Sequence, residues 1–230
     1  TDDVSLSVSR GGIHAVIGPN GAGKTTLIAQ LSGQIRPDSG DIEFDGRSIL
    51  RAGMAQRARA VLARSFQITS VFLEMTILEN AMLAVQGAQG HSYRFWAPTH
   101  KDQGLADIAM DHLMTVGLHH RSGRIVSSIS HGEQRQLEVA MALAMQPQML
   151  LLDEPMAGMG KEETFRMIEI LSLVGAEKTI LMVEHDMDAV FSLADQLSVL
   201  VNGRVIATDS VAQIRSNPEV QKSYLGDSCA

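Results

Sequence analysis

Apolar residues along this chain gather into short runs and into longer stretches where they recur at helical spacing. The runs over 13–17, 149–152 and 179–183 predict parallel strands buried on both faces, because few polar residues interrupt them. Further strands are predicted over 4–8, 41–44, 63–68, 197–201 and 204–208. The last two flank Asn202-Gly203, which is typical of a two-residue hairpin and predicts an antiparallel portion of the sheet.

Helical spacing predicts helices over 25–31, from 76 onward, and over 105–116, 131–145, 161–174 and 218–225. Between the second and third lies an irregular insert, 86–101, which holds the single tryptophan, Trp96. The chain therefore runs from α/β elements through helices and back to α/β elements. This order predicts a single α/β domain over 1–230, with a parallel-sheet core of about 1–68 and 146–230 and an inserted helical subdomain of about 69–145.

The composition argues against several classes of protein. The net charge is −7 and there is no run of Lys or Arg, so we do not expect nucleic acid as a partner. The single cysteine, Cys229, allows no disulfide framework, which suits a reducing cytoplasm. No apolar stretch approaches the roughly 20 residues needed to span a bilayer. Because the chain begins at Thr1 without a Met, just before a predicted strand, we expect an upstream segment to be absent.

Residues 18–25 fit the P-loop pattern G-x-x-x-x-G-K-[ST] at every defined position. A predicted strand precedes the motif and a helix follows it, so backbone N–H groups and the helix N-terminus can face phosphates. The alternative is a glycine-rich turn that binds nothing. We expect Lys24 to reach the β- and γ-phosphates of ATP and Thr25 to ligate Mg²⁺. The expected nucleotide-binding residues here are Asn20, Gly21, Gly23, Lys24, Thr25 and Thr26.

Two adjacent carboxylates, Asp153 and Glu154, end the apolar run before Pro155. In a doubly wound sheet the carboxyl end of such a strand lies beside the P-loop. We expect Asp153 to hold Mg²⁺ through its water shell and Glu154 to activate the attacking water as general base. Two solvated acids at a strand end are the alternative interpretation, which the P-loop elsewhere in the chain disfavours.

Ser130 and Glu133 fit a capping box before the helix predicted over 131–145. Capping alone would explain both residues. However, the segment lies between the P-loop and the Asp-Glu strand, and 129–133 (Ile-Ser-His-Gly-Glu) resembles the signature loop, LSGGQ, of ATP-binding cassette (ABC) ATPases. It departs at three places, with Ile for Leu, His for the first Gly and Glu for Gln, whereas Ser130 and Gly132 match.

The resemblance covers essentially the whole chain and implies a P-loop NTPase with a RecA-like core. Gln67 resembles the glutamine that touches Mg²⁺ and reports to the membrane subunit, and His185 resembles the switch histidine that contacts the γ-phosphate. Without the resemblance, a lone His after a buried strand would be read as structural. The implied catalytic residues are Glu154, His185 and Gln67, and the implied Mg²⁺ ligands are Thr25, Gln67 and Asp153.

Within the family the likeness is greatest to the ATPases of branched-chain amino acid importers and their urea or amide relatives, carried by 65–72, 129–138, 183–187 and 217–226. It implies a second ATPase subunit, homomeric or a paralogue, and a sandwich in which Ser130 and Gly132 of one subunit face ATP bound to the other. It also implies permease subunits that hold the protein on the cytoplasmic face of the membrane. We hypothesise that the permease contacts the groove around 67–73, although Val71, Phe72 and Leu73 could instead cover the core.

Two alternatives remain open. Lipid and lipopolysaccharide exporters share some of these phrases, and a soluble ABC ATPase without a membrane partner is conceivable. Such soluble proteins usually carry two cassettes or long inserts, whereas this chain has one cassette and a short insert. The transported substrate is not readable from this chain, because that specificity belongs to the permease and the binding protein.

Overall fold

A six-stranded sheet forms the centre of the molecule, with strand order β4-β5-β6-β1-β7-β8. The computed structural model describes residues 1–60, 62–64, 71–89 and 102–222. The strands are β1 (Ile13–Ile17), β4 (Leu62–Arg64), β5 (Met149–Asp153), β6 (Thr179–Val183), β7 (Gln196–Val201) and β8 (Arg204–Asp209). Neighbouring strands are parallel except for β7 and β8. The predicted parallel core with an antiparallel portion is therefore confirmed.

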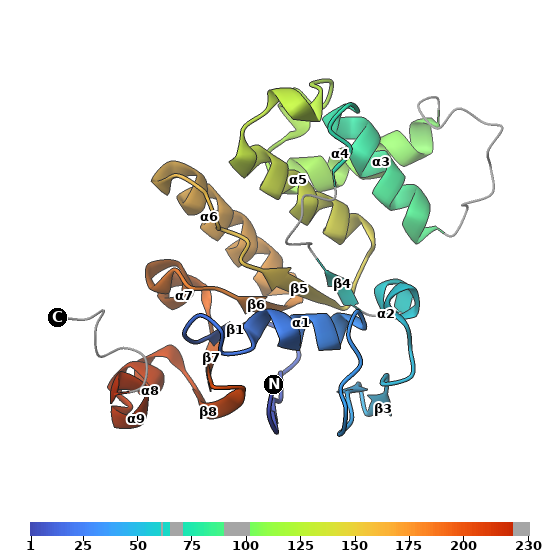
Figure 1. Cartoon of the computed structure of the whole chain (residues 1–230). Helices are drawn as coiled ribbons and strands as arrows, with labels where there is room; N and C mark the ends of the chain where they lie inside the picture. Colours follow the sequence, from blue (N-terminus) through green and yellow to red (C-terminus); the bar gives the residue numbers. More distant parts are fainter. Residues whose placement is uncertain (61, 65–70, 90–101, 223–230) are drawn as a thin grey trace.

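Successive side chains of the central strands alternate between two hydrophobic layers, one on each face of the sheet. Val16 of β1 packs with Leu27 and Ile28 of helix α1 (Lys24–Ser32) on one face. Its neighbours Ala15 and Ile17 belong to the layer on the other face, which includes helices α6 (Lys161–Glu177) and α7 (Met187–Leu193). Figure 1 shows α1 and α6 on opposite sides of the strands. Burial on both faces explains why these strands are mostly apolar, with His14 of β1 as a buried polar exception.

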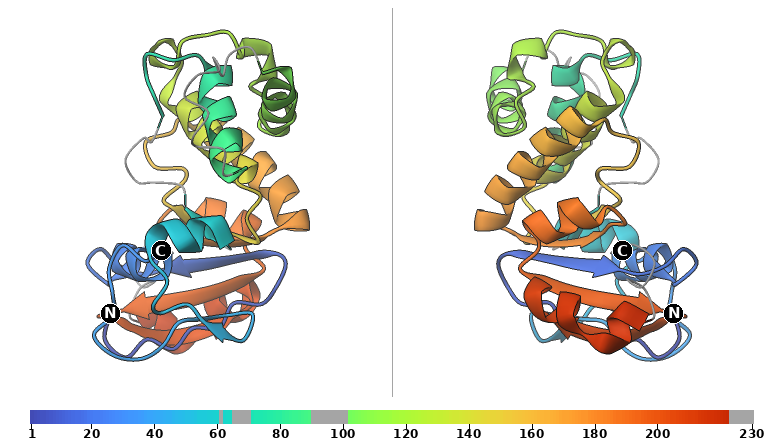
Figure 2. Two further views of the ribbon diagram at one scale, coloured as in Figure 1. Left: turned by 90° about the vertical axis from the view of Figure 1, so that its right-hand side faces the viewer. Right: turned by 90° about the vertical axis from the view of Figure 1, so that its left-hand side faces the viewer.

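Helices α3 (Ile77–Ala88), α4 (Gln103–Thr115) and α5 (His131–Ala144) form a lobe beyond one face of the sheet (Figure 2). Their buried residues, among them Ile77, Leu113 and Leu137, join the same hydrophobic layer as α6. Two single turns of 3₁₀ helix, His119–Arg121 and Val126–Ser128, connect α4 to α5. The helical subdomain is thus present as a spatial unit, while its sequence limits at about 69 and 145 stay a prediction.

The prediction of a strand over 4–8 is wrong, because these residues form no ladder in the structure. Val4, Leu6 and Val8 still pack against the layer that contains α1, and this side-chain packing produces the alternating pattern. The strand expected over 41–44 is shorter: β2 (Glu43–Phe44) pairs with β3 (Arg47–Ser48) in a separate two-stranded sheet. The strand expected over 63–68 is seen as β4, which starts one residue earlier at Leu62 and is described to Arg64, while 65–68 lie outside the described residues.

Short helices are where the sequence prediction failed most often. The helices α2 (Met54–Ala60), α7 and α8 (Val211–Ser216) were not predicted, since each has too few turns to give a clear period. Helix α9 (Pro218–Val220) begins where the C-terminal helix was expected. The Asn202-Gly203 turn joins β7 to β8 with positive φ at both residues, 49° and 80°, as a type I′ hairpin requires.

A buried chain of polar groups crosses three strands. His14 Nε2 lies 2.8 Å from Ser198 Oγ, which lies 2.6 Å from Thr208 Oγ1. His14 is 3% exposed, and burial lowers the pKa of its imidazole. The folded state therefore favours the neutral ring, as expected for a histidine in the second position of a central strand.

This burial predicts a loss of stability in acid. The folded-state pKa of His14 lies below the unfolded value of about 6.5, so the unfolded chain binds the extra proton as the pH falls. The contribution of neutral His14 is fully present above that value and declines below it, by at most about 1.4 kcal/mol per pH unit. Urea unfolding of the wild type and of His14→Gln between pH 5 and 8 checks this. A constant difference between the two proteins across that range would contradict it.

Candidate active site

The P-loop joins the carboxyl end of β1 to α1. A Cβ at Gly18 would collide with the carbonyl oxygen of Leu200, so only glycine allows this close approach of β1 and β7. Gly23, at φ 103°, is the N-cap of α1 and provides no capping side chain. By contrast, Thr76 and Ser130 cap α3 and α5 through their side chains. The N-terminus of α1 is therefore suited to receiving phosphate oxygens in place of a side-chain cap.

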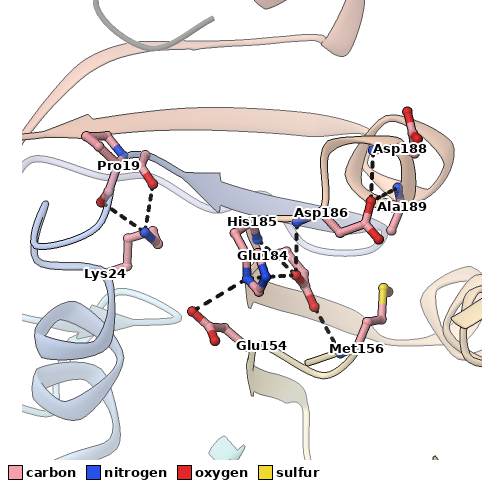
Figure 3. Close-up of polar contacts among 10 residues, drawn as sticks. Pro19, Lys24, Glu154, Met156, Glu184, His185, Asp186, Asp188 and Ala189 are labelled. Carbon is pink, nitrogen blue, oxygen red and sulfur yellow. Dashed lines mark hydrogen bonds and ion pairs between the residues drawn. The ribbon is translucent and has the colours of Figure 1, made fainter. Parts of the chain in front are cut away.

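Lys24 lies at the centre of this loop and is 7% exposed. Its Nζ donates to the carbonyl oxygens of Gly18 at 2.7 Å and Pro19 at 3.1 Å (Figure 3). Burial lowers the pKa of the ammonium, and the carboxylates of Glu154 and Asp153 act against that shift. The Lys24 ammonium is thus held over the loop and in the field of both carboxylates, and its role in binding phosphates stays a prediction.

Asp153 and Glu154 leave the sheet next to the P-loop. Asp153 is 1% exposed and is the last residue of β5, paired in register with Val183 of β6. Glu154 has a positive φ of 51°, and its N–H still donates to Val183 O at 2.9 Å. A left-handed conformation at a residue that is not glycine costs free energy and is typical of functional sites. It turns the Glu154 side chain out of the strand while Asp153 stays buried.

His185 follows β6, and its imidazole ring lies close to the carboxylates of Glu154 and Glu184. Its Nδ1 lies 3.8 Å from Glu154 Oε1 and 3.7 Å from Glu184 Oε2, and just over half of the side chain is exposed. Figure 3 shows Lys24, Glu154 and His185 gathered around one space at the ends of the strands. The structure thus brings together residues that are 161 positions apart in the sequence, counting from 24 to 185.

Glu184 is a residue that sequence reasoning missed. It is completely buried, and its carboxylate accepts from the N–H groups of Met156 at 2.9 Å, His185 at 2.9 Å and Asp186 at 3.3 Å. One buried anion therefore ties the turn after β5 to the turn after β6. No sequence signal separates this Glu from an ordinary strand-end acid, since its donors are set by the packing of two loops.

The signature-loop residues lie apart from this group, at the N-terminus of α5. Ser130 Oγ accepts from Glu133 N at 3.2 Å, and Glu133 Oε2 accepts from Ser130 N at 3.0 Å, so the predicted capping box is confirmed. Ser130 and Gly132 meet Glu163 of α6 rather than the P-loop. Gln67 and Trp96 lie outside the described residues. Asn20, Gly21 and Thr25 are exposed, and Thr26 is half-buried beside them.

Comparison with known proteins supports the family resemblance that the sequence motifs indicate, and the matches span nearly the whole chain. The family profile described as "ABC transporter" matches residues 1–157, and one described as "Branched-chain amino acid ATP-binding cassette transporter" matches 204–230. The high-affinity branched-chain amino acid transport ATP-binding protein LivG of Salmonella typhimurium is 34% identical, over 98% of this chain and 91% of that protein.

Solved structures agree with this. MJ1267, described as an ATP-binding cassette of an ABC transporter, superposes with a TM-score of 0.84 at 30% identity, over 96% of this chain and 90% of that one. Its ADP conformation gives a TM-score of 0.81 at 28% identity, over 97% and 91% of the two chains. The likeness extends to a cassette that has been solved with nucleotide.

Replacing Glu184 by Gln is expected to lower the turnover of ATP at least about 10-fold while leaving ATP binding intact. The glutamine NH2 group would face backbone N–H donors that the carboxylate oxygen now accepts from. The lost hydrogen bonds loosen both turns and lower the free energy of unfolding by about 1–3 kcal/mol. The measurements are turnover per nucleotide-binding site and ATP affinity by calorimetry. His14→Gln is the matched control, a buried change in the sheet that touches neither turn. Equal turnover losses in the two variants would make Glu184 a purely structural residue.

Proposed function

The chain belongs to the ABC transporter ATPase family, and we propose that it is the ATP-hydrolysing subunit of a membrane importer for branched-chain amino acids. The named relatives are transport proteins for these amino acids, and the C-terminal profile carries the same description. The alternatives of a lipid exporter or a soluble non-transport ATPase are not favoured by these matches. Related small polar solutes remain within the proposal.

The observation that carries the proposal is the meeting of Lys24, Asp153, Glu154 and His185 at one edge of the sheet. Lys24 and the N-terminus of α1 bind the phosphates, with Asn20 and Gly21 among the loop residues. Glu154 takes the proton from the attacking water, since its carboxylate projects beyond the strand end. His185, within 3.8 Å of Glu154, contacts the γ-phosphate and senses whether it is present.

The residues present also fit Mg²⁺. Asp153 at the end of β5 offers a buried carboxylate and Thr25 in the first turn of α1 offers an exposed hydroxyl, while Gln67, the third proposed ligand, lies outside the described residues. Mg²⁺ in nucleotide sites is typically held by one or two protein groups together with phosphate oxygens and waters, so this small donor set is sufficient. When bound, the ion neutralises charge on the β- and γ-phosphates.

The signature loop requires a second subunit in this proposal. Ser130 and Gly132 sit at the N-terminus of α5, and within the subunit their contact is Glu163 rather than Lys24. They would bind the γ-phosphate of ATP held by the partner subunit, as in the sandwich that the family resemblance implies. A helix N-terminus with a serine hydroxyl offers the same donors as a P-loop. Binding closes the dimer and hydrolysis reopens it.

The permease is proposed to bind beside α3. Phe72 and Leu73 are 56% and 45% exposed, whereas Val71 is buried in the core. The interpretation that all three cover the core is therefore wrong for Phe72 and Leu73. Asn80, fully buried, holds this segment: its Oδ1 accepts from Phe72 N at 2.7 Å and its Nδ2 donates to Phe72 O at 3.0 Å.

A third exposed apolar residue, Ile125, extends the surface formed by Phe72 and Leu73. Ile125, 47% exposed, pairs with Thr76 in an antiparallel bridge, and Ser127 N donates to Leu73 O at 3.0 Å. The two segments are thus fixed to one another, with apolar side chains left toward solvent. Apolar anchors of this kind carry most of the affinity of an interface.

Within the described residues, no helix is both long and apolar enough to cross a membrane.

Glu154→Gln is expected to lower ATP turnover at least about 10²-fold, because it removes the general base and keeps the shape of the side chain. ATP should then hold the subunits in a stable dimer. Phosphate release and sedimentation velocity measure the two effects. The double variant Lys24→Ala with Glu154→Gln is the control and should stay monomeric, since ATP no longer binds. Turnover at the wild-type rate in Glu154→Gln would assign the base to another residue.

Phe72→Asp is expected to leave folding and ATP binding unchanged and to weaken association with permease-containing membranes at least about 10-fold. The reason is that a charge replaces an apolar anchor at the proposed interface. Co-sedimentation with such membranes and amino acid uptake report the effect. Leu173→Asp, at an exposed apolar position on α6, is the matched control. Unaltered uptake by Phe72→Asp would place the docking surface elsewhere, for which the insert around Trp96 is the next candidate.

A further inference from the structure

An internal carboxylate already lies on the signature loop. Glu163, in the first turn of α6, accepts a hydrogen bond from Ser130 Oγ to its Oε1 at 2.8 Å. A Cβ placed on Gly132 would lie 2.5 Å from Glu163 Cδ and 2.6 Å from its Oε1. The carboxylate therefore rests directly on the part of the loop that has no side chain.

The surroundings of this carboxylate are those of a bound anion. The pKa of Glu163 is lowered, first by the hydrogen bond from Ser130, then by backbone N–H groups of Gly160 and Gly132 and by nearby His131, while burial opposes the shift. Glu163 Oε2 also accepts from Gly160 N at 3.3 Å, which caps α6. The donors that reach it from α5 are a serine hydroxyl and the N-terminus of a helix, which favour phosphate equally.

We propose that Glu163 is an intramolecular competitor of the nucleotide: its carboxylate occupies the Ser130–Gly132 site and is displaced by the γ-phosphate carried on a second subunit. This inference rests on the proposed function, because it requires the composite site of the ATP-bound dimer. Two anions cannot share one hydroxyl and one helix terminus without strong repulsion. The carboxylate must leave before the dimer closes.

The consequence is that the contact between Glu163 and Ser130 weakens dimer formation. Glu163 satisfies Ser130 in the monomer, so closing the dimer exchanges one charge-assisted contact for another and gains less free energy than binding to an empty site. The contact is solvent-accessible, so its effect on the dimer dissociation constant is modest, about 3- to 10-fold. Closure is then favoured only by a ligand with more charge and more acceptor oxygens than a carboxylate, which a γ-phosphate provides.

The test uses the full chain with Glu154→Gln, which prevents turnover, and measures the dimer dissociation constant in saturating ATP by sedimentation equilibrium. Adding Glu163→Gln removes the charge at constant shape and is expected to tighten the dimer about 3- to 10-fold. Glu162→Gln is the matched control. Glu162 lies in the same turn of α6 and pairs with Arg166 at 3.3 Å, and removing its charge is expected to change the dissociation constant less than twofold.

A second variant separates competition from helix capping. Glu163→Asp keeps a charge at the start of α6 but is one methylene shorter, so it withdraws from Ser130; it should also tighten the dimer. ATP binding to the monomer, measured by calorimetry, should be the same in all variants. A dimer that is unchanged or weaker in both Glu163 variants overturns the competition. Failure of Glu154→Gln itself to dimerise with ATP overturns the proposed composite site, and the competition with it.

Discussion

The register of three parallel strands is the constraint on which the rest of this molecule depends. Val183 of β6 pairs with Val16 of β1 on one side and with Asp153 of β5 on the other, so the three strands end along one line. The residues that follow β1, β5 and β6 therefore lie at the same edge of the sheet. A one-residue slip of β5 would exchange its two faces and bury the wrong side chains, and the two hydrophobic layers on either side of the sheet prevent this.

That edge is held together by hydrogen bonds to a buried carboxylate as well as by packing. Glu184 collects three backbone N–H groups from two turns, and Glu154 sits in a left-handed conformation beside it. A fully buried carboxylate is tolerated only when its oxygens are well satisfied, and here the donors belong to the segments that carry Glu154 and His185. The hydrogen bonds of that buried carboxylate thus help to set the spacing of Glu154 and His185, the proposed catalytic residues.

Two helix N-termini are used in opposite ways. Helix α1 begins at a glycine without a capping side chain, next to a lysine that is held over the loop by two carbonyl oxygens. Helix α5 begins with a complete capping box and, in addition, with the Glu163 carboxylate resting on it. The first is proposed to bind phosphate within the subunit, whereas the second already has side-chain partners. In the proposed dimer, nucleotide has to displace a side-chain partner at α5, whereas the N-terminus of α1 carries no side-chain cap.

Elements whose signals are local could be predicted from the amino-acid sequence. The P-loop, the apolar strands, the Asn202-Gly203 hairpin and the Ser130 capping box each depend on residues within a few positions of one another, and each was found where it was predicted. The tertiary structure alone decided what depends on distant neighbours. It left 4–8 without a ladder partner, exposed Phe72 while burying Val71, and brought Glu184 to Met156 and Glu163 to Ser130. Periodicity reports which side of an element is apolar, but the partner of a carboxylate is set by packing between elements that lie far apart in the chain.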